Sequence, residues 1–422
     1  MSERSLLVRM HGSLLGTVEQ DMAGHLHLHY DSSWLARREA VPLSLSLPLS
    51  QSHHSSDAVR NYLQGLLPDN WDVRRRWARE YHVSPDNPFA LLRHVGRDVA
   101  GAAEFISPNA SDDERPTGFA PLTDTDIAAR LRTLQRDSAA WVTGGRTGQF
   151  SLAGAQAKFT LTWFNDQWHD PGGDAPSTHI FKPGIDGLAH SALGEHLLLQ
   201  VAAAVGLPVV ESRYQYFEDL TAIVVTRFDR ATAGTSIQRI HQEDLCQATG
   251  TPPDQKYENE GGPGLADIAK LIRDTMPMAP ARKAAQDLQR FAIFNWLTAS
   301  TDAHAKNIAV LHTGNGPRLA PLYDLASALP YLDHAERRRA TLAMRVGRHY
   351  RIVDIQRRHW HALAETLGVT TASTDEALHD LTSRLPSAID RVSKEHMHEG
   401  EFVQRWQELL QKHVRTLAVA AT

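Results

Sequence analysis

The stretch Ala299–Ala328, ASTDAHAKNIAVLHTGNGPRLAPLYDLASA, decides the predicted fold. It predicts a turn followed by an apolar strand over Ile308–Leu311. A hairpin follows at Gly314 and Gly316, and a second strand is expected to end at Tyr323–Asp324. The stretch therefore predicts a two-stranded ribbon with polar residues at both of its outer ends.

Three oxygen-bearing side chains flank these two strands. Asp302 and Asn307 precede the first strand and Asp324 ends the second, so the hairpin would bring them to one edge of the ribbon. Phosphoryl transfer needs such a set, because one carboxylate orients the attacking hydroxyl while an amide and a second carboxylate hold magnesium. Asp302 and Asn307 have the spacing of the protein-kinase catalytic loop, although His-Arg and Asp-Phe-Gly are missing. Either residue alone is typical of a turn, but the three together favour a metal site.

The composition fits a large globular protein. The chain has 422 residues, enough for two or three domains or one bilobal enzyme, with 42% hydrophobic and 22% charged residues. A net charge of −5 argues against general nucleic-acid coating but leaves a local basic patch open. The single cysteine, Cys246, excludes an internal disulfide framework, and the 23 histidines contain no HExxH pattern of a zinc enzyme.

We expect a cytoplasmic protein. The first residues contain no uninterrupted apolar core, because Arg9 and His11 break it, so no signal peptide is predicted. The longest apolar run, Leu197–Val210, contains Gln200 and Pro208 and is too short to span a bilayer. We therefore expect no membrane partner.

Residues 1–106 are predicted to form an amino-terminal subdomain rich in short elements. Residues 107–122, SPNASDDERPTGFAPL, are polar and proline-rich and predict a linker. The expected elements of the subdomain are an antiparallel meander at Ser5–Tyr30, an extended edge at Pro42–Leu49, helices at Asp57–Leu67 and Asn70–Tyr81, and a strand at Gly101–Ile106.

Residues 123–228 are predicted to complete a β-rich lobe, and residues 229–422 to form a helical lobe. The first segment has the strand–strand–helix–strand–strand order of a kinase amino-terminal lobe, at Lys158–Trp163, Thr178–Phe181, Ser191–Val205, Val209–Phe217 and Ala222–Arg227. The second is predicted to be mostly helical, at Gln242–Thr249, Leu265–Asp274, Ala284–Thr298, His359–Leu367, Thr374–Arg384 and the tail to Val419. The predicted class is α+β, a bilobal protein-kinase-like fold that binds a small ligand between its lobes.

Ten ordered segments carry a resemblance that covers essentially the whole chain. They are PLSLSLPL at Pro42, LLPDN at Leu66, VGRDVAGA at Val95, SLAGAQAK at Ser151, THIFKP at Thr178, RFDR at Arg227, QEDLCQ at Gln242, KYENEGGPG at Lys256, TDAHAKN at Thr301 and PLYDLASALP at Pro321. In these segments the chain resembles the HipA toxin kinases of bacterial type II toxin–antitoxin modules. The resemblance implies a serine/threonine kinase that uses ATP and Mg²⁺, with a HipB-like helix-turn-helix antitoxin and operator DNA as partners.

The resemblance also implies roles for the residues of the hairpin. It gives Asp302 the part of general base, and it gives metal binding and nucleotide contacts to Asn307 and Asp324. Lys182, at the end of a strand, would hold the α- and β-phosphates, and Glu195 on the next helix would orient it. Without the resemblance, a snorkelling lysine and a solvated helix-face glutamate would be the favoured interpretations.

The segment from Ser151 to Lys158 stands where kinases have a glycine-rich phosphate loop. Its small residues would let backbone N–H groups approach phosphates closely, and Lys158 would add a charged contact. In the family the serine that matches Ser151 is autophosphorylated, which switches the enzyme off. The nucleotide-binding residues expected here are Leu152, Ala153, Gly154, Ala155, Gln156 and Lys158.

Five further residues complete the expected nucleotide site. Thr226, Arg227 and Phe228 fall at the hinge that would read the adenine edge, and Thr226 stands where family members often have Glu. His304 could donate a hydrogen bond to the γ-phosphate, and a structural histidine is an equally good interpretation. Tyr323 is included in the set, although packing is the favoured interpretation of its ring.

Three functions remain open at this point. The first is a serine/threonine kinase toxin whose target, by resemblance, would be an aminoacyl-tRNA synthetase. The second is a corepressor that acts mainly with an antitoxin on DNA, for which late arginines would contact phosphates. The third is a small-molecule phosphotransferase, which leaves residues 1–106 unexplained. The arginines in question are Arg337, Arg338, Arg339, Arg345, Arg348, Arg351, Arg357 and Arg358.

Overall fold

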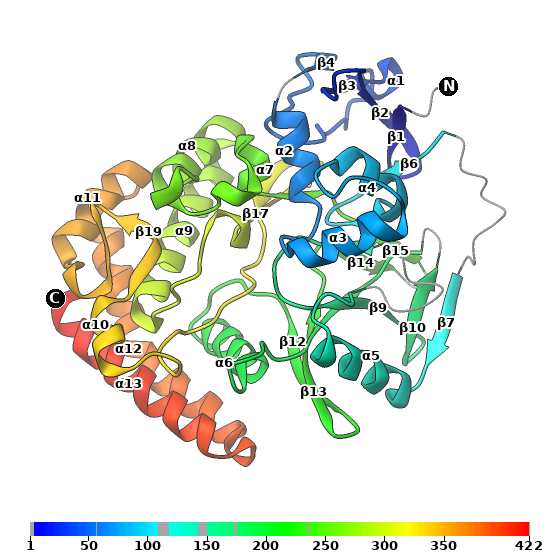
Figure 1. Cartoon of the computed structure of the whole chain (residues 1–422). Coiled ribbons are helices and arrows are strands. Elements are labelled where there is room, and N and C mark those ends of the chain that lie inside the picture. Colours follow the sequence, from blue (N-terminus) through cyan, green and yellow to red (C-terminus); the bar gives the residue numbers. More distant parts are fainter. Residues whose placement is uncertain are drawn as a thin grey trace. The chain divides into compact units, whose positions relative to one another are not determined.

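The computed structural model of the protein describes residues 4–55, 57–108, 118–141, 150–172, 175–233 and 236–421. The chain forms two compact units, each assembled from several segments. The first contains Met1–Ile185, Tyr214–Asp254 and Ala309–Asn315, and the second contains Asp186–Arg213, Gln255–Ile308 and Gly316–Thr422. Both sheets and helices are present, which confirms the α+β class (Figure 1).

The first unit begins with a five-stranded antiparallel sheet in the order β4-β3-β2-β1-β6. Alternate residues of β1 are buried, including Leu6, Val8 and Met10, so one face of this sheet packs on a core. Helix α2 packs against β3 and α4. The strands are β1 (Ser5–Met10), β2 (Ser13–Gln20), β3 (Leu26–Tyr30), β4 (His53–His54) and β6 (Ala103–Ile106), and the helices are α1 (Ser32–Leu35), α2 (Asp57–Gly65), α3 (Trp71–Glu80) and α4 (Pro88–Val95).

A six-stranded sheet in the order β12-β13-β11-β9-β10-β7 follows. Its edge strand β7 covers the last five residues of the predicted linker, and Thr123 caps the next helix with a capping box, as the sequence predicts. Residues 109–117 of the linker lie outside the described residues. The elements are β7 (Gly118–Leu122), α5 (Asp124–Arg136), β9 (Phe159–Phe164), β10 (Gln167–Gly172), β11 (His179–Lys182), β12 (Ser212–Phe217) and β13 (Leu220–Thr226).

Short strand pairs complete the first unit. Strand β5 pairs in parallel with β8, and β14 with β15 and β16 with β17 are antiparallel pairs. Helix α7 begins after Asp244, which forms a capping box with Gln247. The elements are β5 (Asp98–Val99), β8 (Phe150–Ser151), β14 (Arg230–Ala233), β15 (Ser236–Arg239), β16 (Gln242–Asp244), α7 (Leu245–Thr249) and β17 (Ala309–Thr313).

The second unit is mostly helical. Helix α9 leads into the loop that begins at Ala299, and α12 packs along α13 (Figure 1). The helices are α6 (Ser191–Ala204), α8 (Leu265–Thr275), α9 (Met278–Thr298), α10 (His334–Arg339), α11 (Arg357–Leu367), α12 (Thr371–Glu395) and α13 (Glu401–Ala421), and the strands are β18 (Gly316–Leu319), β19 (Thr341–Val346) and β20 (His349–Arg351). No helix in the described ranges combines the length and apolar composition needed to cross a membrane.

Three predicted elements were wrong in part. The second strand of the ribbon ends at Leu319 instead of Tyr323–Asp324, because Pro321 has no N–H to donate and only Leu322 forms a single bridge beyond it. Pro42–Leu49 makes no strand beyond one bridge between Ser44 and Leu47. The predicted helix at Gln242–Thr249 begins as strand β16 and turns helical only after Asp244.

A buried ion network ties β5 to the segment that follows β13. Asp98 accepts from Arg230 at 2.7 Å, and Arg227 donates two hydrogen bonds to Asp229, at 3.0 and 2.8 Å. Asp229 also accepts from the Gly101 backbone at 2.7 Å. Burial alone would raise the pKa of Asp98, but the arginines outweigh it and hold that pKa below its usual value. All four charged side chains are buried, so each depends on its partners.

Removing one member of this network should destabilise the protein strongly. Asp98→Ala leaves the buried guanidinium groups of Arg227 and Arg230 to share one carboxylate, that of Asp229, and we expect a loss of about 3–5 kcal/mol in the free energy of unfolding. Chemical denaturation checks this. Asp72→Ala is the matched control, because Asp72 is exposed and its ion pair with Arg75 spans 3.7 Å, so it should cost about 0–1 kcal/mol. Equal losses in the two variants would contradict the account.

Candidate functional site

The loop after α9 carries the candidate general base. Helix α9 ends at Thr298, and Ala299 adopts a left-handed φ of 51° that turns the chain. The Asp302 carbonyl then accepts hydrogen bonds from the His304 backbone at 2.9 Å and from the Asn307 side-chain amide at 2.8 Å. Two hydrogen bonds between residues of the loop therefore close it.

The side chain of Asp302 is exposed at the surface of this loop. Its Oδ1 accepts a hydrogen bond of 2.6 Å from the hydroxyl of Tyr257. Sequence reasoning missed Tyr257, although the residue lies in the KYENEGGPG segment that contributed to the resemblance. Its contact partner is 45 positions away, so no local pattern could have paired the two.

The metal-ligand candidates have the chemistry that magnesium prefers. Because the Asn307 amide nitrogen donates to the Asp302 carbonyl, its Oδ1 is the atom left for a cation. Asp324 is exposed and has a left-handed φ of 58°. The hydroxyl of the adjacent Tyr323 donates to the Lys306 carbonyl at 2.7 Å, which ties this segment to the loop. Amide and carboxylate oxygens of this kind fit a Mg²⁺ ion.

The charges of the Asp302 and Asp324 carboxylates both affect the pKa of His304. Burial lowers the pKa of its imidazole to about 4, and Lys256 acts in the same direction, whereas Asp302 and Asp324 oppose the shift. Both carboxylates therefore act on one buried ring. Within the described chain His304 Nδ1 has no hydrogen-bond partner, and the ring meets Tyr257 edge to face at 5.1 Å. At neutral pH the imidazole is uncharged and can offer one N–H.

The candidate phosphate loop belongs to the first unit. Ser151 is buried, and its hydroxyl donates to the Leu66 carbonyl at 2.8 Å. Gly154 has a φ of +106°, and a side chain there would meet the Lys158 ammonium at 2.5 Å. Lys158 donates to the Ala153 carbonyl at 2.8 Å and lies 4.8 Å from the Trp141 ring centroid. The lysine thus holds the loop shape that glycine permits.

Other contacts fix the two ends of this loop. The Gly154 carbonyl accepts from the Asp69 backbone at 3.0 Å, and Gln156 donates to the Pro183 carbonyl at 2.9 Å. Pro183 directly follows Lys182, which is buried at the end of β11 opposite Ile223. The loop and the strand-end lysine are therefore connected within one unit. Leu152 is buried, and Ala155 is exposed at the tip of the loop.

The predicted hinge contains a residue with a structural task. The guanidinium of Arg227 is buried in the ion network with Asp229, and the Arg227 backbone N–H donates to Thr178 at 2.9 Å. An Arg227 contact to nucleotide would therefore have to come from its carbonyl. Thr226 pairs with His179 at the end of β13. Phe228 is half-buried.

Glu195 lies on α6 in the second unit and is 5% exposed. This burial excludes the alternative that Glu195 is a solvated residue on the face of a helix. A buried carboxylate needs polar partners.

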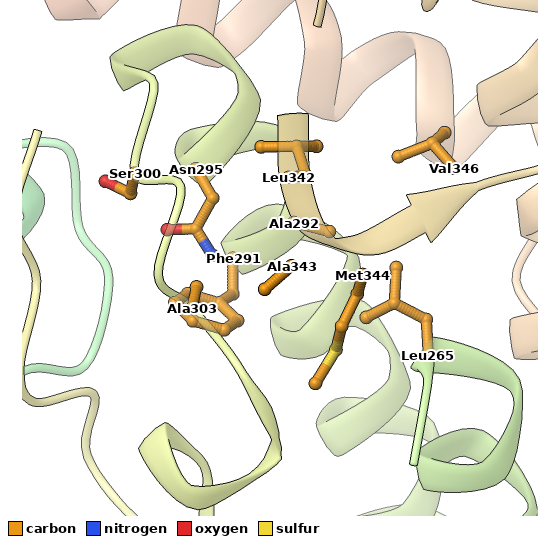
Figure 2. Close-up of a pocket in the computed structure, with 10 residues that line it drawn as sticks. All are labelled: Leu265, Phe291, Ala292, Asn295, Ser300, Ala303, Leu342, Ala343, Met344 and Val346. Carbon is orange, nitrogen blue, oxygen red and sulfur yellow. The ribbon is translucent and has the colours of Figure 1, made fainter. Parts of the chain in front are cut away.

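A small cavity is lined in part by Ser300 and Ala303 of the loop after α9 (Figure 2). Ala303, the residue between Asp302 and His304, forms part of its wall. The other lining residues are Leu265, Phe291, Ala292, Asn295, Ser300, Leu342, Ala343, Met344 and Val346. The lining is mainly apolar, so it packs the loop against α9 and β19 and adds no charged group to the site.

Comparisons with known proteins show the family to which the chain belongs. Residues 6–106 match the HipA N-terminal domain family, and residues 150–389 match the HipA-like C-terminal domain family. The chain belongs to the HipA family. It is 34% identical to the putative kinase Y4mE of Sinorhizobium fredii, over 93% of this chain and 92% of the relative. The chain is therefore a HipA-type kinase.

Two comparisons with Shewanella oneidensis proteins extend over nearly the whole chain. The chain is 29% identical to the serine/threonine-protein kinase toxin HipA, over 92% of this chain and 90% of the relative. The solved complex of HipA, HipB and operator DNA superposes with a TM-score of 0.82 at 26% identity, covering 97% of each chain. The bilobal kinase-like fold predicted from the sequence is confirmed.

The lowered pKa of His304 gives a measurable pH dependence. Because its folded pKa of about 4 lies below the usual 6.5, the unfolded chain binds more protons between these values. Stability should therefore fall as pH decreases from 6.5 towards 4, and His304→Gln should reduce this fall. Histidine NMR titration, assigned with that variant, should show a midpoint near 4. A midpoint at 6.5 would contradict the burial argument.

Proposed function

We propose that the protein is an ATP- and magnesium-dependent serine/threonine kinase that acts as the toxin of a type II toxin–antitoxin module. One observation carries the proposal. The exposed Asp302 carboxylate projects from a loop that Asn307 closes, and Asp302 and Asp324 both act on the buried His304 of that loop. A base and one oxygen ligand on this loop, with a second carboxylate on the segment that Tyr323 ties to it, are the groups that phosphoryl transfer requires.

Each residue has a distinct part in the proposed reaction. Asp302 would accept the proton of the attacking serine or threonine hydroxyl. Asn307 Oδ1 and the Asp324 carboxylate would hold magnesium, which when bound neutralises charge on the β- and γ-phosphates. Lys182 would hold the α- and β-phosphates, with Glu195 as its orienting partner. The loop from Leu152 to Lys158 would supply backbone N–H donors.

The environment of Ser151 supports inactivation by autophosphorylation. Its hydroxyl is buried against the Leu66 carbonyl, so the serine must leave this position to accept a phosphate. A phosphoserine carries about −1.5 to −2 charges and would not return beside a carbonyl oxygen. The modified loop would then be displaced and would repel ATP.

The proposed partners are a HipB-like helix-turn-helix antitoxin and, through it, operator DNA. The solved Shewanella complex contains HipA, HipB and operator DNA. In this chain the late arginine cluster divides into two groups. All of them but Arg337 are exposed; Arg345, Arg351 and Arg357 pair with Glu258, Asp354 and Asp375, whereas Arg338, Arg339 and Arg348 form no ion pair within the described residues. This second group would add salt-dependent phosphate contacts, while the antitoxin reads the bases.

These exposed arginines also favour a second candidate function, a corepressor without catalysis.

A kinase toxin would phosphorylate a cytoplasmic protein, which we propose is an aminoacyl-tRNA synthetase. A small-molecule phosphotransferase is less favoured, because residues 6–106 match a HipA amino-terminal domain that such an enzyme would not need.

The reaction is tested with Asp302→Asn. The variant should lower phosphoryl transfer from labelled ATP about 10²- to 10⁴-fold, because the general base is lost while the nucleotide contacts remain. Phosphoproteomics after induced expression, wild type against Asp302→Asn, should identify the target. Asp274→Asn is the matched control, because Asp274 is exposed and pairs with Lys270. Growth arrest that survives Asp302→Asn would favour the corepressor.

A substitution at Ser151 tests the proposed regulation. Ser151→Glu puts a charge beside the Leu66 carbonyl and should weaken ATP binding roughly tenfold or more, because one unpaired buried charge costs several kcal/mol. Isothermal titration with ATP and magnesium measures this. Ser138→Glu, at an exposed position, should leave binding unchanged. Equal affinities for ATP in the two variants would overturn inactivation through Ser151.

A further inference from the structure

We propose that Tyr257 is a positioning residue for the reaction, because its hydroxyl fixes one oxygen of Asp302 and leaves the other for the substrate. This inference rests on the proposed kinase function. The hydrogen bond from Tyr257 Oη to Asp302 Oδ1 is 2.6 Å long. Within the described part of the chain it is the one hydrogen bond made to the Asp302 carboxylate.

Tyr257 is anchored to the catalytic loop by more than its hydroxyl. Its ring meets the His304 ring edge to face, with centroids 5.1 Å apart. The carbonyl of the preceding Lys256 accepts the Ala305 backbone N–H at 3.2 Å. Tyr257 and Lys256 thus contact Asp302 and two residues that follow it, His304 and Ala305, which favours a fixed position of the tyrosine over a mobile one.

The segment that carries Tyr257 is itself rigid. The Tyr257 carbonyl accepts from the backbones of Glu260 and Gly262, at 3.0 and 2.9 Å. Gly262 has no room for a side chain, because a Cβ there would lie 2.1 Å from the Gln255 carbonyl. The next residue, Glu258, bonds the Arg345 backbone at 2.6 Å and its side chain at 3.0 Å. These contacts fold KYENEGGPG onto itself and onto β19.

This arrangement matters because a carboxylate on a short side chain can rotate. An exposed aspartate without a partner samples several orientations, and only some direct a lone pair at an incoming hydroxyl. The hydroxyl of Tyr257 bonds Oδ1 of Asp302 and so limits rotation of the carboxylate, which keeps Oδ2 in one orientation. The substrate hydroxyl would donate to Oδ2 as its oxygen forms a bond to the γ-phosphorus. The bond from that phosphorus to the β,γ-bridging oxygen would break, ADP would leave with that oxygen, and the hydroxyl proton would pass to Asp302. Tyr257 itself exchanges no proton with substrate.

The test removes only the hydroxyl. Tyr257→Phe keeps the ring against His304, so the segment should fold and melt as in the wild type. The assay uses the dephosphorylated full-length chain, labelled ATP with magnesium, and a synthetic peptide of residues 146–158 as acceptor. We expect kcat to fall roughly 10- to 100-fold, as for loss of one hydrogen bond to a charged group. The KM for peptide and the Kd for ATP should change by less than about twofold.

A double-mutant cycle separates positioning from a general structural effect. If Tyr257 acts through Asp302, then Tyr257→Phe should lower the residual rate of Asp302→Asn by less than about twofold. Tyr216→Phe is the control, because Tyr216 is 54% exposed on β12 and its loss should leave kcat unchanged.

Four results would overturn the proposal. The first is a wild-type kcat in Tyr257→Phe, and the second is a full additional loss in the Asp302→Asn background. The third is a fall in ATP affinity or melting temperature that accounts for the lost rate. The fourth is a wild-type chain that labels neither itself nor the peptide. That last result removes the proposed kinase function as well, whereas the first three leave it standing.

Discussion

The side-chain amide of Asn307 helps to close the loop on which the candidate site depends. Asn307 donates to the carbonyl of Asp302 and so closes the turn between α9 and β17. The same amide keeps its oxygen for a cation, which gives one residue both a structural and a chemical part. His304 is buried inside this turn with a lowered pKa, and the closed loop therefore carries no positive charge of its own from the imidazole at neutral pH.

In the first unit, buried ion pairs hold the segments of the candidate nucleotide site in place. Its candidate phosphate loop begins at Ser151 on β8, which pairs with β5, and β5 also carries Asp98 of the buried ion network. The network anchors Arg227 and Asp229 directly after β13, where the predicted hinge lies. The start of the phosphate loop and the hinge are thereby fixed to one strand pair, and the mutual burial of charges makes this arrangement specific.

Local patterns in the sequence account for much of this structure. The polar residues ahead of Ile308 predicted a turn before a strand, and the helix predicted at Ala284–Thr298 lies within α9. The predicted end of the second strand was wrong, because Pro321 has no N–H with which to continue the pairing. Long-range partners were beyond sequence reasoning. Tyr257 finds Asp302 across 45 positions, and Arg227 reaches Asp98 across 129, through side chains whose pairing no local pattern encodes.

We propose that the loop from Ala299 to Asn307, together with Asp324, binds a metal-bound nucleotide. The most direct measurement is anomalous scattering from crystals grown with Mn²⁺ and a non-hydrolysable ATP analogue. We expect an anomalous peak for a manganese ion that the side-chain oxygens of Asn307 and Asp324 bind. The phosphates of the analogue should bind the same ion, and the Asp302 carboxylate should face the terminal phosphate. A nucleotide bound elsewhere, or a manganese ion that contacts neither residue, would contradict it.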